Sequence, residues 1–339
     1  MKLLQCCLAA LFVSKMLAAS ASAAIVFSDD FNLGSSSANY NAAQLGQNLA
    51  TFAYDYSERG IAAPVVGQAD TLGLKLESNM TQAALSSITL HTVQQFTGAY
   101  SVKFNAWMNV NGPLPDGGAG STEFFTAGVG GNGTSVNFGG SGATGSGGWT
   151  AVDGEGGSGI DYRLYKGATL QAPSSGQYAA GTVDSPTASN SRNANDPYYA
   201  QFGGVDVAAL PVQGANNVPT LGSFVDQTGT SRVGTFGFEW HEVELLVDPT
   251  GGTAGAASMT WIIDGLEIGA LDAGIGASFS TDGSVTLGYY DPFSGVSGNA
   301  AVSFAVIDNL VVTQIPEPTT FALLGMTGVA LAAASRRRA

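Results

Sequence analysis

Two glutamates stand two residues apart in the segment Trp240-His241-Glu242-Val243-Glu244. In an extended strand, residues i and i+2 point to the same side, so the carboxyl groups of Glu242 and Glu244 would face one surface. Two carboxyl groups about 5–5.5 Å apart can cleave a glycosidic bond with retention of configuration. However, Val243 separates the pair, and Glu239 falls on the opposite face of the strand. We therefore expect no enzyme activity. The alternative is a glycoside hydrolase or lyase in which Glu242 and Glu244 are the acids.

Other kinds of catalytic site lack the residues they need. The only cysteines, Cys6 and Cys7, lie in a predicted signal sequence, so the mature chain can form no disulfide or thiolate metal site. His91 and His241 are too few for a zinc site built mainly from histidine. The sequence also contains no His-Glu-x-x-His motif, and no Gly-x-Ser-x-Gly motif followed by Asp and His. We expect His241 to be structural.

Calcium is the one cofactor that the polar residues suggest. Asp29 and Asp30 lie near the first predicted strand, and Asp308 and Asn309 near the last. The first and last strands of two-sheet β domains often pair, which would gather these oxygen-bearing side chains, and calcium binds six to eight oxygens. The alternative is turn formation and capping by Asp and Asn, and the sequence does not separate the two. A second acidic group, 153–161, lacks the spacing of an EF-hand loop.

Aromatic residues form a second candidate site. Tyr198, Tyr199 and Phe202 lie in an otherwise polar segment, and Trp240 opens the acidic strand. Aromatic faces on a loop can stack on sugar rings. The alternative, which we favour for the segment containing Tyr198, is that its rings pin the loop onto the body of the domain.

The elements that must position these residues are β-strands joined by turns rich in Gly, Asn, Ser and Pro. Apolar patterning predicts twelve strands and no helix before Phe321. The predicted strands are Ala24–Phe27, Thr51–Tyr54, Leu72–Glu77, Tyr100–Asn109, Glu123–Val129, Trp149–Asp153, Ile160–Tyr165, Phe236–Val247, Met259–Asp264, Leu266–Leu271, Ser284–Tyr289 and Val302–Val312. Without repeats of fixed period, so many strands favour an all-β, antiparallel jelly-roll sandwich over 24–314. Residues 172–233 are expected to form one long loop insertion.

Charge limits the partners of this domain. Residues 24–314 contain 25 acidic and 7 basic side chains, a net charge of −18. Such a surface repels nucleic acid and anionic lipid, and it favours cations and neutral or basic partners. Solubility alone also accounts for much of this charge.

Both ends of the chain carry targeting patterns. Residues 1–23 have a positive start, an apolar run and Ala21-Ser22-Ala23, a site that signal peptidase cleaves. Residues 315–339 contain Pro316-Glu317-Pro318, an apolar stretch over 321–334 that is typical of a helix, and Arg336, Arg337 and Arg338. The prolines keep the motif extended, and the arginines stop transfer on the cytoplasmic side. An ordinary C-terminal membrane anchor is the alternative for this tail.

The order of these three features in the tail closely resembles the PEP-CTERM sorting signal of Gram-negative bacteria. The resemblance implies that an exosortase, a membrane cysteine protease, recognises and removes the tail during delivery to the surface. Before that step, the apolar helix would hold the protein at the inner membrane.

The segment from Trp240 to Asp248, the Gly-rich turn after it, and the strand ending at Asp264-Gly265 resemble hairpins of laminin-G-like and concanavalin-A-like sandwiches. Asp264-Gly265 is also a strong signal for a two-residue turn. Laminarinase-type hydrolases of this fold carry an aspartate between two glutamates, where this chain has Val243. The resemblance thus implies an exported, non-enzymatic protein of the cell surface or extracellular matrix, with polysaccharide as its expected ligand. A purely structural or adhesive module is the second alternative.

Overall fold

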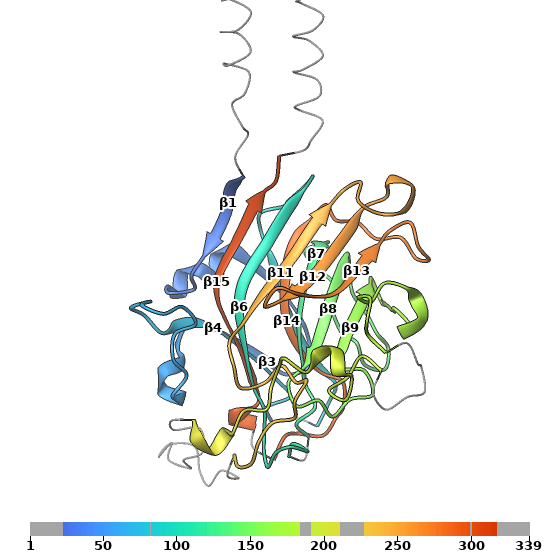
Figure 1. The fold of residues 1–339 in the computed structure, drawn as a ribbon. Helices are drawn as coiled ribbons and strands as arrows, with labels where there is room; N and C mark the ends of the chain where they lie inside the picture. Colours follow the sequence, from blue (N-terminus) through green and yellow to red (C-terminus); the bar gives the residue numbers. More distant parts are fainter. Residues whose placement is uncertain are drawn as a thin grey trace, which may run out of the picture.

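The protein folds into two antiparallel β-sheets packed face to face (Figure 1). The computed structural model describes residues 23–81, 83–118, 120–183, 191–210, 227–298 and 300–316. These residues form fifteen strands and seven short 3-10 helices, and none of them belongs to an α-helix. The predicted all-β antiparallel sandwich is confirmed.

The first sheet has eight strands, in the order β13-β12-β11-β6-β15-β4-β3, with β1 also paired to β15. Their bounds are β1 Ala24–Asp29, β3 Asn48–Asp55, β4 Leu72–Ser78, β6 Tyr100–Asn109, β11 His241–Asp248, β12 Ser258–Ile263, β13 Leu266–Asp272 and β15 Phe304–Gln314. Neighbours such as β6 and β15 are far apart in the sequence. The chain therefore crosses repeatedly between the sheets, as in a jelly roll.

The second sheet has seven strands, in the order β10-β9-β8-β7-β14-β5-β2. Their bounds are β2 Tyr40–Leu45, β5 Ser86–Thr92, β7 Phe124–Gly131, β8 Gly148–Asp153, β9 Tyr162–Lys166, β10 Thr169–Leu170 and β14 Ser284–Asp291. The 3-10 helices lie in the connections: η1 Gly34–Asn39, η2 Tyr56–Arg59, η3 Pro173–Ser175, η4 Pro197–Tyr199, η5 Val207–Ala209, η6 Thr253–Gly255 and η7 Ala300–Val302.

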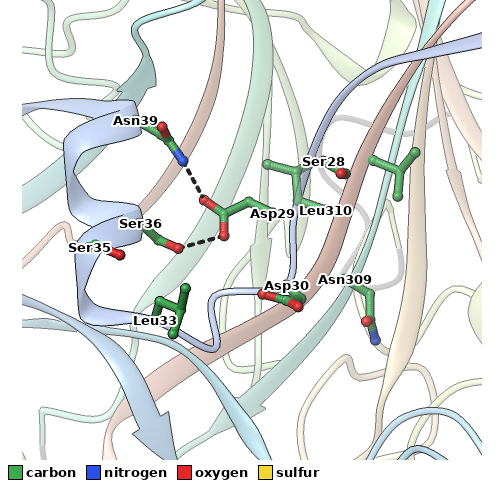
Figure 2. A pocket seen from close by; sticks show the side chains of 10 residues that line it. Ser28, Asp29, Asp30, Leu33, Ser35, Ser36, Asn39, Asn309 and Leu310 are labelled. Atoms are coloured by element: carbon green, nitrogen blue, oxygen red, sulfur yellow. Dashed lines mark hydrogen bonds between the residues drawn. The ribbon is translucent and has the colours of Figure 1, made fainter.

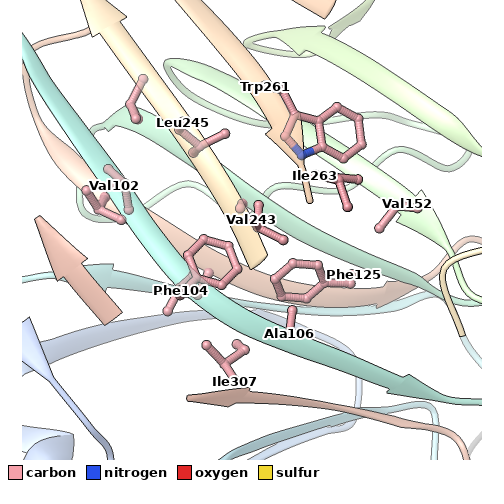
Figure 3. Close-up of a cluster of buried hydrophobic side chains, with 14 of the residues drawn as sticks. Val102, Phe104, Ala106, Phe125, Val152, Val243, Leu245, Trp261, Ile263 and Ile307 are labelled. Carbon is pink, nitrogen blue, oxygen red and sulfur yellow. The ribbon is translucent and has the colours of Figure 1, made fainter. Parts of the chain in front are cut away.

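The main core fills the space between the sheets (Figure 3). Alternate residues of each strand point inwards, so β6 contributes Val102, Phe104 and Ala106, while β11 contributes Val243 and Leu245. All five side chains are buried. Each large aliphatic or aromatic side chain removed from water in this way contributes about 1.5–3 kcal/mol.

The outer faces of both sheets are also partly covered. A second cluster, which includes Tyr56, Trp107 and Phe304, contains residues of the connections after β3 and around η5. On the outer face of the second sheet, Trp149 stacks on Tyr165 at 3.9 Å between ring centroids, in a third cluster that also contains Phe138 of the β7–β8 connection. Because connections cover parts of the outer faces, strand side chains that point outward there can be apolar.

Each of the twelve predicted strands corresponds to an observed one, but the predicted strand at Phe236 begins only at His241. The strands β2, β5 and β10 were not predicted. Within the predicted long loop, η3, η4 and η5 interrupt the described part, while 184–190 and 211–226 lie outside the described residues.

The predicted targeting segments fall largely outside the described residues. These are 1–22, with Ala21 of the cleavage site, and 317–339, with Glu317, Pro318, the apolar stretch 321–334 and Arg336, Arg337 and Arg338. In the part of the chain that the structure describes, no helix has the length and apolar character needed to cross a bilayer.

Candidate functional site

A pocket lies where the first and last strands pair. β1 runs antiparallel to β15, with Asp29 opposite Leu310, and η1 lies on the other side of the Asp29 carboxylate (Figure 2). The pocket has a volume of about 490 Å³ and is lined by Ser28, Asp29, Asp30, Leu33, Ser35, Ser36, Asn39, Asn309, Leu310 and Val311. The structure thus brings together three of the four residues predicted as calcium ligands: Asp29, Asp30 and Asn309.

The Asp29 carboxylate is fully engaged by donors of its own segment. Its Oδ1 accepts from Phe31 N at 2.9 Å and Ser36 Oγ at 2.8 Å. Its Oδ2 accepts from Asn39 Nδ2 at 3.1 Å and Tyr40 Oη at 3.3 Å. Burial, together with this carboxylate, raises the pKa of Tyr40. Asp29 therefore forms a turn through Phe31 N and holds η1 against β1, which agrees with the turn-forming part of the alternative, although it does not cap η1, whose N-cap residue is Leu33.

Asp308 does not join the other three residues. Its carboxylate accepts hydrogen bonds from Tyr56 Oη and Gln68 Nε2, each at 2.9 Å, and burial raises its pKa. The cause is a β-bulge, since the register of β15 against β6 shifts between Asp308 and Val311. Within the bulge Asn309 has a φ of 56°.

The four predicted ligands therefore do not converge on one point. Calcium needs six to eight oxygens, and four donors already surround the Asp29 carboxylate. Within the described ranges, no group of three or more His, Cys, Asp or Glu side chains could hold a metal ion. An ion in this pocket would draw on Asp30 and on neutral oxygens of Ser and Asn. Calcium binding stays a prediction.

The two glutamates of the acidic strand lie on the outer face of the first sheet, opposite the side that Val243 presents to the core. Glu242 and Glu244 both pair with Lys103 of β6, at 3.3 Å and 3.2 Å. Their side chains are 56% and 17% exposed. The same-side placement expected from their spacing is correct, and one lysine neutralises part of the charge of both.

His241 has a structural environment. Its ring is buried, with Nδ1 2.6 Å from Asp264 Oδ2 and Nε2 3.1 Å from Phe236 O. Asp264 and Gly265 have φ values of 49° and 78° and join β12 to β13. Positive φ at both central residues defines the predicted two-residue hairpin turn. The Asp264 carboxylate also accepts from Glu242 N, so it ties this turn to β11.

Tyr199 and Phe202 are not available to a ligand, which corrects their assignment as binding residues. Both are buried in the main core, where Tyr199 stacks on Tyr162 at 3.9 Å between ring centroids. Tyr198 is only partly buried, and its hydroxyl donates to Glu267 O at 2.7 Å. The rings pin the segment 191–210 onto the sandwich, as the favoured alternative predicted.

Trp240 likewise serves packing. Its ring lies edge-on to Tyr56 and Trp107, with centroid distances of 5.3 Å and 5.9 Å. Its Nε1 donates to Ala62 O at 2.6 Å. Trp240 therefore holds the connection between β3 and β4 against the outer face of the first sheet.

Several buried carboxyl groups lie close together at the end of the second sheet where β7 begins. The sequence pattern indicated only some of them, the acids of 153–161. Glu155 accepts from the hydroxyls of Ser121 and Thr122, which bind its two carboxylate oxygens. Burial, and next the nearby Asp153, raises the pKa of Glu155 to about 7. Burial and Asp153 also raise the pKa of Asp161.

Two further acids extend this group and were missed from the sequence. Glu123 hydrogen-bonds to the Tyr289 hydroxyl, and complete burial raises its pKa well above the usual range. Asp291 accepts from Asn79 Nδ2 at 2.6 Å, and burial raises its pKa to about 6. Glu123 lies immediately before β7, and Asp291 is the last residue of β14. This position at a strand end is the sequence feature that could have identified them.

The last strand leads directly into the tail. β15 ends at Gln314, and Ile315 N donates to Ala99 O at 2.8 Å. The PEP-CTERM protein-sorting motif matches residues 314–338. The chain is therefore an antiparallel β-sandwich protein that carries a sorting signal for export. No curated protein matches the chain.

Solved structures with similar arrangements are distant in sequence. A protein of unknown function with a galectin-like fold from Bacillus subtilis is 11% identical, with a TM-score of 0.39, and the match covers 86% of this chain and 96% of that one. An endo-beta-1,3-glucanase from Pyrococcus furiosus is 10% identical, with a TM-score of 0.38 and coverage of 87% and 95%. An endo-beta-1,4-glucuronan lyase from Trichoderma reesei is 10% identical, with a TM-score of 0.34 and coverage of 86% and 96%.

Proposed function

We propose that this protein is a non-enzymatic component of the cell surface or extracellular matrix that binds polysaccharide. An N-terminal signal exports it, the C-terminal tail holds it transiently at the inner membrane, and an exosortase removes that tail. The observation that carries the proposal is the match of residues 314–338 to the sorting motif, directly after the last strand of a two-sheet sandwich.

The absence of catalysis is supported by the surroundings of the acidic strand. Glu242 and Glu244 share Lys103 as an ion-pair partner, so neither is a carboxyl group set apart as a proton donor. His241 is held by Asp264 and Phe236 O. Val243, between the glutamates, points into the core.

The pocket beside β1 supports polysaccharide as the ligand. Its lining combines hydroxyl, amide and carboxylate groups with the aliphatic side chains of Leu33, Leu310 and Val311. Sugars offer hydroxyls to the polar groups and CH faces to the aliphatic ones. Asp30 uses Oδ1 to accept from Asn32 N at 3.1 Å, which leaves Oδ2 for a sugar hydroxyl. The net charge of −18 over 24–314 favours neutral over acidic glycans.

The sorting step predicts two molecular forms. In a bacterium with the processing protease, the wild-type chain should reach the surface or medium without its tail. Replacement of both prolines, Pro316→Ala with Pro318→Ala, should leave a full-length protein in the inner membrane, because the extended stem is lost. Immunoblots of cell fractions measure both forms. A wild-type protein that stays full length, or stays in the cytosol, contradicts the proposal.

Glycan arrays test the ligand. The purified protein should bind neutral glycans, and Asp30→Ala should weaken binding by about tenfold, since a hydrogen bond to a charged group contributes about 1.5–3 kcal/mol. Glu242→Gln, on the outer sheet face, is the matched control and should bind normally. Runs with calcium and with a chelator measure any metal requirement. Absence of glycan binding favours the purely adhesive alternative, and release of oligosaccharides from bound glycans favours the hydrolase or lyase.

A further inference from the structure

The end of the sandwich where the tail leaves the body is formed by five segments, here called the tail-exit end: 24–26, 93–99, 249–257, 273–283 and 313–316. Ala24 pairs with Gln314, and Gln314 Nε2 donates to Ala99 O at 2.7 Å. Tyr100 Oη donates to Thr281 O, and Ala273 N donates to Ala257 O. The segments therefore form one continuous surface, at the upper end of Figure 1.

The chemistry of this end differs from that of the rest of the domain. Within its five segments the only charged residue is Asp282. Asp248 and Asp272 lie at the edges of these segments and accept from Thr250 N and Thr253 N, and Lys166 donates to Ile275 O. Four large apolar side chains there are exposed to solvent: Ile25 at 67%, Val26 at 37%, Val93 at 53% and Ile275 at 38%. The opposite end carries the ion pair of Asp116 with Arg232, together with the buried carboxyl groups around Glu155.

The chain length beyond the structure sets how far this end can lie from a membrane. Only 317–320 separate Pro316 from the apolar run 321–334. Five extended residue steps reach at most about 18 Å. The polar headgroup layer on each side of a bilayer is roughly 5–8 Å deep, so the tail-exit end must stand at or near the headgroups whenever the apolar run is inserted.

We propose that the tail-exit end is a membrane-facing surface, which rests on neutral lipid headgroups while the tail remains attached. This inference rests on the proposed anchoring of the tail. Ile25, Val93 and Ile275 enter the interfacial layer, where burial of apolar area stabilises the contact. The carboxylates of Asp248, Asp272 and Asp282 outnumber the single lysine, Lys166, at this end, so anionic lipid gives no electrostatic gain. The buried carboxyl groups of Glu155 and its neighbours, and the connections around them, then face away from the membrane.

Single-cysteine labelling tests this orientation. The only cysteines are Cys6 and Cys7, so their replacement by serine leaves a chain without thiols. The full chain is produced in a host without the processing protease and reconstituted with its tail into phosphatidylcholine vesicles. A fluorophore is attached in separate variants at Ile25→Cys, Val93→Cys and Phe293→Cys, and lipids with a headgroup nitroxide serve as the quencher.

Phe293 is the matched control, because its exposure of 59% is close to that of Val93. It follows β14 at the far end of the second sheet, and the eleven-residue strand β15 spans about 36 Å between the two ends. Labels at Ile25 and Val93 should lose their fluorescence, while the label at Phe293 keeps it. Equal quenching at all three positions in protein that floats with the vesicles overturns this inference alone. Protein that does not float overturns the proposed anchoring, and the inference with it.

Discussion

The protein should be markedly more stable at pH 5 than at pH 8, because its folded state holds protons on buried carboxyl groups. The pKa of Glu155 is raised to about 7 and that of Asp291 to about 6, mainly by burial. In the unfolded chain these groups lose their protons near pH 4. The stabilisation that these carboxyl groups contribute is therefore fully present below about pH 4, and it is lost as the pH rises through about 7. Deprotonation of Glu155 alone should lower the free energy of unfolding by roughly 2–3 kcal/mol between pH 5 and pH 8.

Urea unfolding between pH 5 and pH 8 measures the effect. Glu155→Gln should flatten the profile, since the amide keeps an acceptor for Ser121 or Thr122 but no longer titrates. Glu242→Gln, whose side chain is 56% exposed, should leave the slope unchanged. His91 acts in the opposite direction, because burial lowers its pKa, so its own contribution to stability is lost on acidification below about pH 6.5. Stability that rises steadily from pH 5 to pH 8 would contradict the prediction.

The apolar alternation of the strands was sufficient to predict most of the fold, and β5 shows why it was not sufficient everywhere. This strand has polar side chains at Ser87, Thr89 and His91, yet it is buried along its whole length. The connection between β7 and β8 covers that face and bonds to each of them, through Asn137 O, Asn137 N and Ser135 O. A strand with a covered polar face has the residue pattern of a loop, because the groups that bond to its polar side chains come from another part of the chain.

The candidate calcium site shows a similar limit. The pairing of the first and last strands could be expected, and it does place Asp29, Asp30 and Asn309 at one pocket. The bulge that separates Asp308 from them adds one residue to β15. No residue type at this position requires a bulge, so its effect on side-chain direction could not be derived from the sequence.

Tyr199→Ala should destabilise the protein by about 3–5 kcal/mol, the usual cost when a large buried aromatic ring is removed. The ring is fully buried, stacks on Tyr162 and fixes η4 to the core. Tyr198→Ala is the matched control, since its ring is partly exposed and it loses one hydrogen bond to Glu267 O. That change should cost about 1 kcal/mol. Chemical denaturation measures both variants.

Tyr199→Phe separates the ring from its hydroxyl. The Tyr199 hydroxyl is buried with no hydrogen-bond partner among the described residues, and a buried polar group without a partner costs about 1–3 kcal/mol. Its removal should therefore leave the free energy of unfolding unchanged or raise it, while the stacked ring remains. If Tyr199 bound a sugar instead, Tyr199→Ala would weaken glycan binding at unchanged stability. Equal stability of wild type and Tyr199→Ala would thus contradict the packing role, because only a ring outside the core can be removed at no cost.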